Sequence, residues 1–318
     1  MKVLIADKFE SQGIEQLKAA GCEIISNPEL AGDTLVAALK DTACQILIVR
    51  STKVPAEAIQ AATGLKLVIR AGAGYDTIDV KAASATGVKV ANCPGMNSTA
   101  VAELAMGMIV ALDRRIVHNT LDLRNGVWNK KEYSKALGLK GRTLGIIGLG
   151  KIGMLLAERA RAFEMNLLYT DVVANAAAEQ KLAARKVDLD TLLKESDFIS
   201  VHTPGGEGTK HLIGSAQLAL MKPTACLINC ARGGVMDEKA VAQAIQAGKL
   251  RGAALDVFEQ EPGANDKEFH DSVIQCDRVY GTHHIGASTD QAQLAVAEET
   301  VRIVEAFKAN GQVLNCVN

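Results

Sequence analysis

Three clusters of polar residues follow apolar runs of the sequence and could together carry out acid–base chemistry. The segment LINCARGG brings Arg232 just after an apolar run, and the planar guanidinium of arginine binds a carboxylate through two hydrogen bonds. The segment ALDVFEQEP supplies Asp256 and Glu261, and THHIGAST supplies His283 and His284. Reversible hydride transfer at a hydroxyl-bearing carbon needs this combination: a histidine that moves a proton, a carboxylate that orients it and an arginine that holds an acid.

A glycine pattern typical of dinucleotide binding lies upstream of these clusters. Gly148, Gly150 and Gly153 match G-x-G-x-x-G between the apolar run TLGIIG and the helical pattern MLLAERARAF. Glycines in that context allow a tight turn, approach of the backbone to a pyrophosphate and close packing of helix on strand. Asp171 follows Gly153 by eighteen residues, where a carboxylate accepts hydrogen bonds from a ribose diol. Because that carboxylate would repel the 2′-phosphate of NADP, the sequence predicts NAD as cofactor.

The elements that must position these residues alternate between apolar strands and amphipathic helices. Strands are expected at residues 2–6, 22–25, 45–49, 66–69 and 88–92, and in a second series at 143–148, 166–171, 197–203, 225–230, 252–257 and 277–282. Short continuous apolar runs are typical of parallel strands that are buried on both faces. Helical patterns between them predict two doubly wound α/β sheets, whose ligands bind at the carboxyl ends of the strands.

Two longer helical segments complete the pattern. Residues 98–125 are expected to be one helix, apolar nearly all round between Val101 and Leu112, and therefore placed at a domain or subunit interface. Residues 290–310 form an amphipathic pattern that should end at Gly311.

Composition limits the partners of the chain. Its 318 residues correspond to about two domains, and its formal net charge of −1 leaves no basic excess for nucleic acid. Seven cysteines, odd in number and without a C-x-x-C pair, argue against a disulfide framework or a metal site and favour the cytoplasm. No apolar run is long enough to cross a membrane, and the N-terminus lacks the pattern of a signal peptide.

The ordered motifs resemble the D-isomer-specific 2-hydroxyacid dehydrogenase family over essentially the whole length. The matching segments are VRSTKV, RAGAGYDTID, GMNSTAVAELAMGMI, LKGRTLGIIGLGKIG, DFISVHTP, INCARGGVMDEKA, GAALDVFEQEP and HIGAST. Within the family, the chain is most similar to the phosphoglycerate dehydrogenases. It departs from the family pattern at His283, where a proline is usual, in VRSTKV, which is one residue shorter than usual, and in the segment HTPGGEGTKHLI.

The resemblance implies a role for each matching residue. Arg232 would bind the substrate carboxylate, Glu261 would pair with the imidazole, and His284 rather than His283 would give and take the proton. NAD would be contacted by Ala73, Gly148, Gly150, Lys151, Ile152, Gly153, Asp171, Thr203, Cys230, Ala231, Asp256 and Gly286. Besides Arg232, the substrate would be contacted by Arg50, Ser51, Ala71 and Gly72.

The resemblance also implies an order of domains. Residues 1–97 and 288–318 would form a flavodoxin-like substrate domain, and residues 98–287 a Rossmann NAD-binding domain inserted into it. The C-terminal segment VLNCVN would return to the first sheet, and the chain would form a homodimer. The additional C-terminal regulatory domain that many phosphoglycerate dehydrogenases carry is not expected here, and neither is inhibition by serine through such a domain.

The substrate stays open at this point. Candidates are 3-phosphoglycerate, whose oxidation to 3-phosphohydroxypyruvate belongs to serine biosynthesis, glycerate with hydroxypyruvate or glyoxylate in the reverse direction, and D-lactate. Arg50, a second cation beyond Arg232, favours a substrate with a phosphate, unless Arg50 is only a surface salt-bridge partner. An alternative from another class is an NAD-sensing, corepressor-like binding protein on the same fold.

The remaining histidines and Cys230 receive structural interpretations. His202 and His211 are expected to support the fold, and His118 and His270 to lie on the surface. Cys230 has no adjacent base in the sequence and is expected to be a small wall residue rather than a nucleophile.

Overall fold

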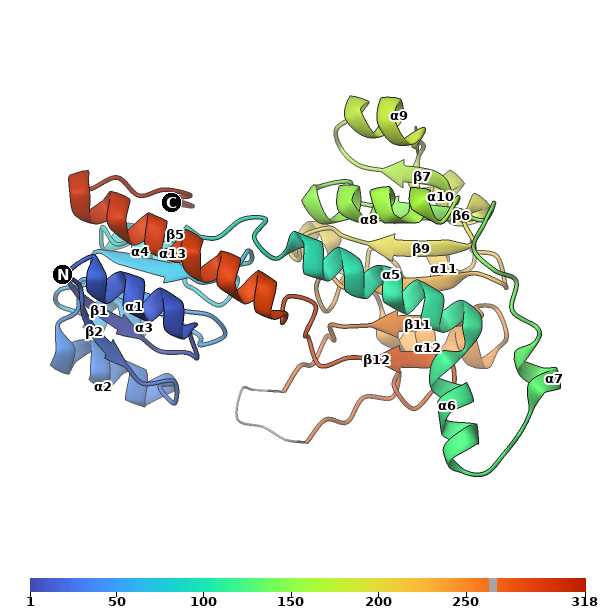
Figure 1. Cartoon of the computed structure of the whole chain (residues 1–318), viewed down its shortest axis with the longest axis horizontal. Helices are drawn as coiled ribbons and strands as arrows, with labels where there is room; N and C mark the ends of the chain where they lie inside the picture. Colours follow the sequence, from blue (N-terminus) through green and yellow to red (C-terminus); the bar gives the residue numbers. More distant parts are fainter. Residues whose placement is uncertain (263–267) are drawn as a thin grey trace. The chain divides into compact units, whose positions relative to one another are not determined.

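Two compact α/β units make up the chain, of which the structure, a computed structural model, describes residues 1–262 and 268–318 (Figure 1). Unit 1 comprises Met1–Asn97 and Ala287–Asn318, and unit 2 comprises Ser98–Gly286. Each unit contains one parallel sheet with helices on both faces. The predicted fold class, two doubly wound parallel α/β sheets, is therefore confirmed.

The sheet of unit 1 has five strands in the order β2-β1-β3-β4-β5. Its strands are β1 (Lys2–Ile5), β2 (Glu23–Ser26), β3 (Ile46–Val49), β4 (Leu67–Arg70) and β5 (Lys89–Asn92), and all pairs are parallel. This is the flavodoxin-like order, in which the chain reverses direction across the sheet between β1 and β3. The central strands are apolar because both of their faces are covered.

Helices from both ends of the chain cover the sheet of unit 1. One face is covered by α1 (Ser11–Ala19) and α13 (Asp290–Asn310), and the other by α2 (Gly32–Thr42), α3 (Ala56–Ala61) and α4 (Val80–Ala85) (Figure 1). Helix α13 has the predicted bounds and ends at Gly311, whose φ of +76° is the left-handed cap that glycine favours. The C-terminal segment returns to β5 as expected, with the Val317 N–H donating to the Val90 carbonyl at 2.9 Å.

The sheet of unit 2 has seven parallel strands in the order β12-β11-β10-β9-β6-β7-β8. The strands are β6 (Thr143–Ile147), β7 (Asn166–Thr170), β8 (Arg185–Lys186), β9 (Phe198–Val201), β10 (Cys226–Asn229), β11 (Gly252–Leu255) and β12 (Val279–Gly281). The chain reverses direction across the sheet between β6 and β9, the usual place for a dinucleotide. Strand β8 was not predicted, because its two residues are exposed and charged.

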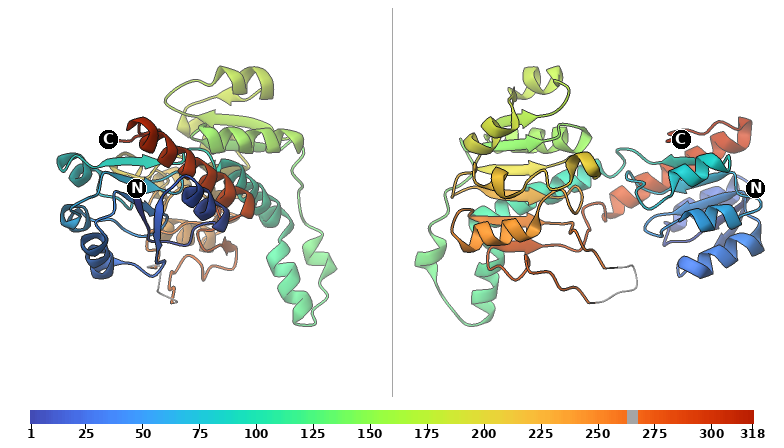
Figure 2. Two further views of the ribbon diagram at one scale, coloured as in Figure 1. Left: turned by 60° about the vertical axis from the view of Figure 1, so that its left-hand side comes forward. Right: turned by 180° about the vertical axis from the view of Figure 1, so that it is seen from behind.

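Helices cover both faces of this sheet as well. Figure 1 shows α5 (Ser98–Arg114) and α8 (Lys151–Ala162) on the near face, with α9 (Ala176–Leu182) packed beside α8. The other face carries α10 (Leu189–Glu195), α11 (Ser215–Leu218) and α12 (Glu238–Gln246), seen from behind in Figure 2. Helices α6 (Ile116–Arg124) and α7 (Lys130–Tyr133) belong to an arm, residues 115–140, that extends from the end of α5 (Figure 1).

The prediction of one helix over residues 98–125 is wrong. The helix stops at Arg114 because Arg115 adopts a left-handed backbone, with a φ of +51°, and α6 starts in a new direction. Helix α5 is also not apolar on every side, since Thr99, Glu103 and Gly107 form an exposed stripe.

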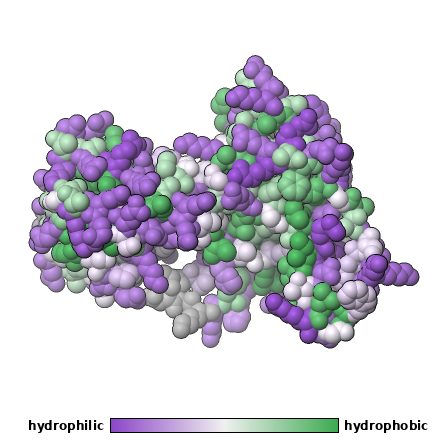
Figure 3. Space-filling model, viewed as in Figure 1, coloured by the Kyte–Doolittle hydropathy of each residue, from purple (hydrophilic) through white to green (hydrophobic). Residues whose placement is uncertain are grey.

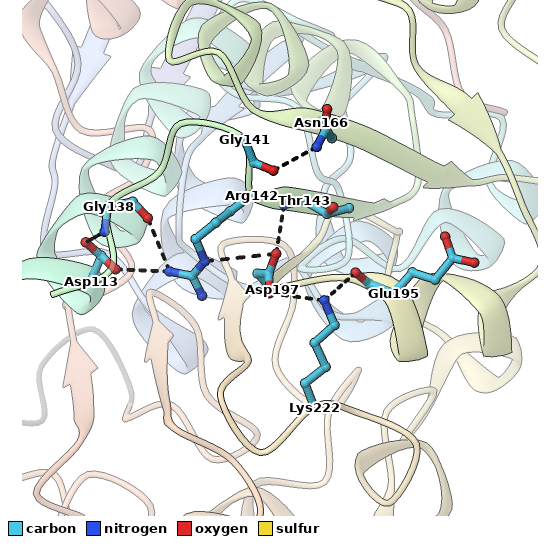
Figure 4. Close-up of polar contacts among 9 residues, drawn as sticks. All are labelled: Asp113, Gly138, Gly141, Arg142, Thr143, Asn166, Glu195, Asp197 and Lys222. Carbon is cyan, nitrogen blue, oxygen red and sulfur yellow. Dashed lines mark hydrogen bonds and ion pairs between the residues drawn. The ribbon is translucent and has the colours of Figure 1, made fainter.

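A network of charged side chains closes the amino edge of the unit 2 sheet (Figure 4). Asp113, at the end of α5, lies 3.0 Å from Arg142, and its second oxygen accepts the Gly138 N–H. The Asp197 carboxylate accepts the Thr143 N–H at 2.9 Å and lies 3.9 Å from the Arg142 guanidinium. These contacts fix the start of β6 and thereby the strand that leads into the glycine loop.

Candidate active site

The sequence-derived candidates of unit 2 gather at one edge of its sheet. Because the strands are parallel, every segment that follows a strand leaves from the same edge. The glycine loop follows β6, Asp171 follows β7, Thr203 follows β9, Arg232 follows β10, and the two histidines follow β12. The fold therefore brings these residues to the carboxyl edge, although they are up to 136 positions apart in the sequence (Gly148 to His284).

The glycine loop has the shape of a pyrophosphate cradle. At Gly148, with a φ of +90°, a Cβ would lie 2.9 Å from the backbone carbonyl of His202. At Gly153 it would lie 2.4 Å from the Gly148 oxygen, so both positions are closed by the protein itself. At Gly150 a Cβ would meet nothing within 4 Å. The loop therefore leaves open space above the start of α8, where the backbone N–H groups of a helix N-terminus favour an anion.

Two polar groups beside this loop fit a dinucleotide. The hydroxyl of Thr203 is buried and has no hydrogen-bond partner among the described residues. The Asp171 carboxylate accepts the Leu149 N–H at 2.7 Å, which holds it beside the loop at the end of β7. A buried hydroxyl without a partner is costly, and a bound cofactor could supply the missing hydrogen bond.

His284 and Glu261 form a direct pair. The Nδ1 atom of His284 lies 2.7 Å from Oε2 of Glu261, and the other carboxylate oxygen accepts the Phe258 N–H at 3.1 Å. Burial acts to raise the pKa of Glu261, but the hydrogen bond from His284, the Phe258 N–H and the charge of Arg232 outweigh it and lower that pKa. An ionised carboxylate only accepts, so Nδ1 carries the proton and the lone pair of neutral His284 lies on Nε2.

The turn that carries His284 is held by Asp256. This side chain is 2% exposed, and its Oδ1 accepts the Thr282 hydroxyl at 2.6 Å and the Ile285 N–H at 2.8 Å. Its Oδ2 accepts the Gly286 N–H at 2.8 Å. His284 itself has a φ of +52°, a left-handed backbone that non-glycine residues rarely adopt and that often occurs at functional sites. Asp256 therefore fixes the direction of the imidazole through the backbone.

Arg232 and Cys230 both follow the end of β10, but their side chains have different surroundings. The guanidinium of Arg232 donates to the Ala231 carbonyl at 2.8 Å, and the Asn229 amide donates to the carbonyl of Arg232. Burial raises the pKa of the Cys230 thiol, which contacts the sulfur of Met108 at 3.6 Å. A protonated, buried thiol packs as a small apolar group and does not act as a nucleophile.

The loop that carries Glu261 rests on a buried carboxyl group that the sequence did not reveal. Glu238, the first residue of α12, is 5% exposed and accepts the Glu259 N–H at 2.7 Å. Burial, together with the hydrogen-bonded carboxyl group of Asp271, raises the pKa of Glu238 to about 8. A protonated Glu238 can both donate to Asp271 and accept from the loop.

The other histidines have distinct surroundings. Burial lowers the pKa of His202 to about 4, and its Nε2 lies 2.8 Å from the Ser200 hydroxyl, so the ring stays neutral. His118 was expected to lie on the surface, but its side chain is largely covered. Its side chain is 14% exposed and lies 2.7 Å from the Tyr280 hydroxyl and 2.9 Å from Asp277. Nothing in the sequence indicates this contact, because the arm and β12 lie far apart along the chain.

The candidates of unit 1 also follow strand ends. After β3, the backbone N–H groups of Arg50, Ser51 and Thr52 all donate to one oxygen of Asp7, at 2.6, 3.1 and 3.1 Å. The guanidinium of Arg50 donates to the Gln293 side chain at 2.7 Å, and also to the hydroxyl of Ser288. Both partners are neutral. Among the described residues, no carboxylate pairs with Arg50, so the structure does not support its interpretation as a surface salt-bridge residue.

The other unit 1 candidates lie on the loop that follows β4. The Ala71 N–H donates to the carbonyl of Val49 at 2.7 Å, the Gly72 carbonyl accepts the Cys93 N–H at 2.9 Å, and the Ala73 carbonyl accepts the Asn92 amide at 2.6 Å. Their backbone groups are thus fixed between β3 and β5. The ligand roles of these residues and of those in unit 2 stay predictions.

Two further features of the described residues bear on function. None of the helices in residues 1–262 and 268–318 is long and apolar enough to span a bilayer. Within the same residues, no group of three or more histidine, cysteine, aspartate or glutamate side chains is arranged to hold a metal ion.

Comparisons with known proteins find similar sequences and one matching family model. A family model described as "D-isomer specific 2-hydroxyacid dehydrogenase, NAD binding domain" matches residues 106–286. The chain is 44% identical to a hydroxypyruvate reductase of Thermotoga maritima, with 98% of each chain covered. It is 41% identical to a D-3-phosphoglycerate dehydrogenase of Methanocaldococcus jannaschii, where the match covers 98% of this chain but only 59% of the relative's length.

The fold also matches solved structures. A D-lactate dehydrogenase from Aquifex aeolicus, in complex with NAD and lactic acid, superposes with a TM-score of 0.85 at 29% identity. The superposition covers 98% of this chain and 96% of the other.

Proposed function

Since the chain belongs to the D-isomer-specific 2-hydroxyacid dehydrogenase family, we propose that it transfers a hydride between a D-2-hydroxy acid and NAD. The observation that carries this proposal is the 2.7 Å contact between His284 and Glu261 at the edge of the sheet that also carries Arg232. NAD, when bound on the glycine loop, supplies the nicotinamide carbon that accepts or returns the hydride.

The residues of this chain divide the remaining work. Arg232 binds the substrate carboxylate through its planar fork and so fixes the position of C2. During oxidation, Nε2 of His284 takes the proton of the C2 hydroxyl as the hydride leaves C2, and the reverse reaction returns that proton to the oxo group. Glu261, whose pKa is lowered, remains ionised near neutral pH and stabilises the imidazolium that forms.

The cofactor preference and the domain roles belong to the same proposal. Asp171, at the end of β7, would bind the ribose diol of NAD and repel the additional phosphate of NADP. Residues 98–287 would form the NAD-binding domain, and residues 1–97 with 288–318 would form the substrate-binding domain that carries Arg50.

We take 3-phosphoglycerate as the substrate, oxidised to 3-phosphohydroxypyruvate in serine biosynthesis. The support comes from Arg50, whose guanidinium is oriented by Gln293 and Ser288 and keeps its positive charge for an anion. The alternative within the family is a hydroxypyruvate or glyoxylate reductase or a D-lactate dehydrogenase. The Thermotoga relative favours hydroxypyruvate among these.

A panel of acids assayed with both cofactors tests the proposal. Purified protein is incubated with 3-phosphoglycerate, D-glycerate or D-lactate plus NAD or NADP, and with hydroxypyruvate or glyoxylate plus NADH, while NADH absorbance is followed. We expect turnover of a D-2-hydroxy acid and a large preference for NAD. Equal efficiency with NADP would remove the role given to Asp171. Binding of NADH without turnover of any acid would instead support the corepressor-like alternative.

An Arg50→Ala variant then distinguishes the substrates. Loss of a charge-assisted hydrogen bond to phosphate should raise KM for 3-phosphoglycerate about tenfold or more, and leave KM for D-glycerate nearly unchanged. The unphosphorylated acid is the internal control, because it uses the same catalytic groups. An equal rise for both acids would make a hydroxypyruvate reductase the better description.

Two properties of the whole protein complete the proposal. We propose a homodimer, supported by the exposed apolar side chains of the arm, residues 115–140. We also propose a cytoplasmic location, supported by seven cysteines that are all free, six of them buried.

A further inference from the structure

A positively charged pocket lies at the amino edge of the unit 2 sheet. It has a volume of about 220 Å³ and is lined by the last two residues of α5, by residues of the arm and by residues that directly precede β11 and β12. Arg251 immediately precedes β11, and Arg278 immediately precedes β12. The turn with His284 leaves the carboxyl end of β12, so the pocket and the candidate active site occupy opposite edges of one sheet.

Cations outnumber acids around this pocket, and both acids are already engaged. The cations are Arg114, Arg115, Lys135, Arg251 and Arg278, and the acids are Asp113 and Glu132. Asp113 turns towards Arg142 and the Gly138 N–H, as Figure 4 shows. Glu132 lies 2.6 Å from Arg115 through one oxygen and 2.5 Å from Lys135 through the other. The pocket therefore carries an excess of positive charge.

The guanidinium groups at the strand ends have no partner of their own. Among the described residues, the side chains of Arg251 and Arg278 make no hydrogen bond or ion pair. Both act on the thiol of Cys226, whose pKa is raised by burial to about 11 against the opposing charges of Arg251, Arg142 and Arg278. Like charges that converge on one pocket repel each other, and a bound anion would relieve that repulsion.

Arg115 presents a fixed guanidinium to the same pocket. Its left-handed backbone, with a φ of +51°, is strained in an L-residue, and such strain is usually retained only where the surroundings impose it. The guanidinium lies over the Tyr133 ring, 5.0 Å from its centre, and its Nε is buried without an acceptor among the described residues. A buried donor without an acceptor indicates that a ligand oxygen belongs beside it.

We propose that this pocket binds a small, doubly charged phosphate group, either inorganic phosphate or a phosphate monoester. The arginine fork matches phosphate oxygens in geometry and charge. The volume is below the roughly 300–1,000 Å³ of pockets that hold drug-sized molecules, so a dinucleotide is too large. Because the arm supplies Arg115 and Lys135 while the strand ends supply Arg251 and Arg278, the bound anion holds the arm against the sheet. The site is independent of the activity proposed above.

Calorimetric titration with inorganic phosphate and with glycerol 3-phosphate tests the site. Glycerol 3-phosphate has no carboxylate for Arg232, so it probes the phosphate group alone. The wild-type protein should bind at least one of the two probes saturably. The probe that binds more tightly shows whether the site prefers inorganic phosphate or a phosphate monoester. Arg251→Gln and Arg278→Gln should each weaken binding roughly tenfold or more, whereas Arg278→Lys, which keeps the charge, should lose less.

Two control variants locate the binding. Arg161→Gln removes an exposed cation of α8 outside the pocket, and Arg50→Gln removes the candidate phosphate ligand of unit 1. Both should bind the probes like wild type. Absence of saturable binding in wild type, an equal loss in Arg161→Gln, or a loss confined to Arg50→Gln would each overturn the proposal. So would sedimentation data in which Arg251→Gln dissociates an oligomer and wild type binds neither probe, because the cations would then hold acids of a second copy.

Discussion

At the level of single side chains, the two adjacent histidines that follow β12 differ in their contacts. His284 contacts Glu261 at 2.7 Å, and its turn is held by the Asp256 carboxylate. The imidazole of His283 is exposed and makes no hydrogen bond or ion pair among the described residues. Only the ring of His284 has a carboxylate that fixes its tautomer, so only His284 offers an oriented lone pair to a substrate hydroxyl.

Alanine substitutions of the two histidines should therefore have different effects. His284→Ala should lower kcat by about 10²–10⁴, the usual contribution of general acid–base catalysis, while NADH binding stays near wild type. His283→Ala should lower kcat far less and serves as the matched control. Both are measured by NADH absorbance in steady state and by fluorescence titration of NADH. If the phenotypes are exchanged, the proton carrier is His283, and if neither variant loses activity, the proposed mechanism is incorrect.

The site could be predicted from the sequence where a residue type is chemically distinctive. Arg232, Glu261 and His284 stand out because their side chains carry the chemistry and occur after apolar runs. The contacts of the supporting carboxylates could not be recognised in this way, even for Asp256, whose position the sequence had already indicated. Asp7 and Asp256 act mainly on backbone N–H groups 29 to 45 positions away, and a backbone donor leaves no mark in the sequence. Such contacts become visible only when the strand order is known.

At the level of elements, helix α12 supports the loop that carries Glu261. Its first residue, Glu238, accepts the Glu259 N–H and shares a hydrogen bond with the Asp271 carboxyl group. Burial and this second carboxyl group raise the pKa of Glu238 from a usual value of 4.5 to about 8. The folded protein therefore holds a proton at Glu238 over a pH range in which the unfolded chain has released it.

This proton makes the stability of the fold dependent on pH. The stabilising effect of the raised pKa is fully present below pH 4.5, and it is lost progressively as pH rises towards about 8. Glu238→Gln keeps the acceptor for Glu259 but does not titrate, so its Tm should fall less steeply between pH 5 and 8 than that of wild type. A change of a few degrees in the Tm difference is expected. Calorimetric melting at several pH values measures it.

The control for this comparison is Glu158→Gln, which removes an exposed carboxylate on α8. Its Tm should follow wild type across the pH range. If Glu238→Gln also runs parallel to wild type from pH 5 to 8, Glu238 is ionised in the folded protein, and the shared proton with Asp271 does not exist.

The helices and strands can be predicted from the sequence where the pattern of apolar residues reveals which side chains are buried. Strands such as β3 and β10 are short apolar runs because both faces are covered, and their shortness and their alternation with helical patterns identify them. The break at Arg115 was missed because arginine is a good helix former, and the contacts with Tyr133 and Glu132 that favour its left-handed backbone come from the arm. Tertiary contacts here override local propensity.

At the level of the whole molecule, the arm has a surface that its own unit does not cover. Helix α6 has nine residues and none of them is buried, although it contains Ile116, Val117, Leu121 and Leu123. The space-filling view in Figure 3 shows hydrophobic residues gathered over α5 and α6. An isolated helix of this length is marginal in water, so an apolar contact from outside the unit would stabilise it. In the homodimer proposed above, a second copy related by a two-fold axis would provide such a contact.

A charged residue on this surface should therefore weaken the dimer. Leu121 is 49% exposed. Because of the two-fold symmetry, one substitution removes this leucine from both sides of the interface. Since burial of a full leucine side chain is worth about 1.5–3 kcal/mol and about half of each is already covered, Leu121→Asp should raise the dimer Kd roughly 10- to 100-fold. Phe163→Asp, at a position that is 46% exposed beyond the end of α8, is the matched control and should leave the dimer intact. Sedimentation velocity over a range of concentrations measures the dimer Kd of both variants. An equal effect of the two variants would place the dimer contact elsewhere. A wild-type protein that sediments as a monomer would show that there is no dimer.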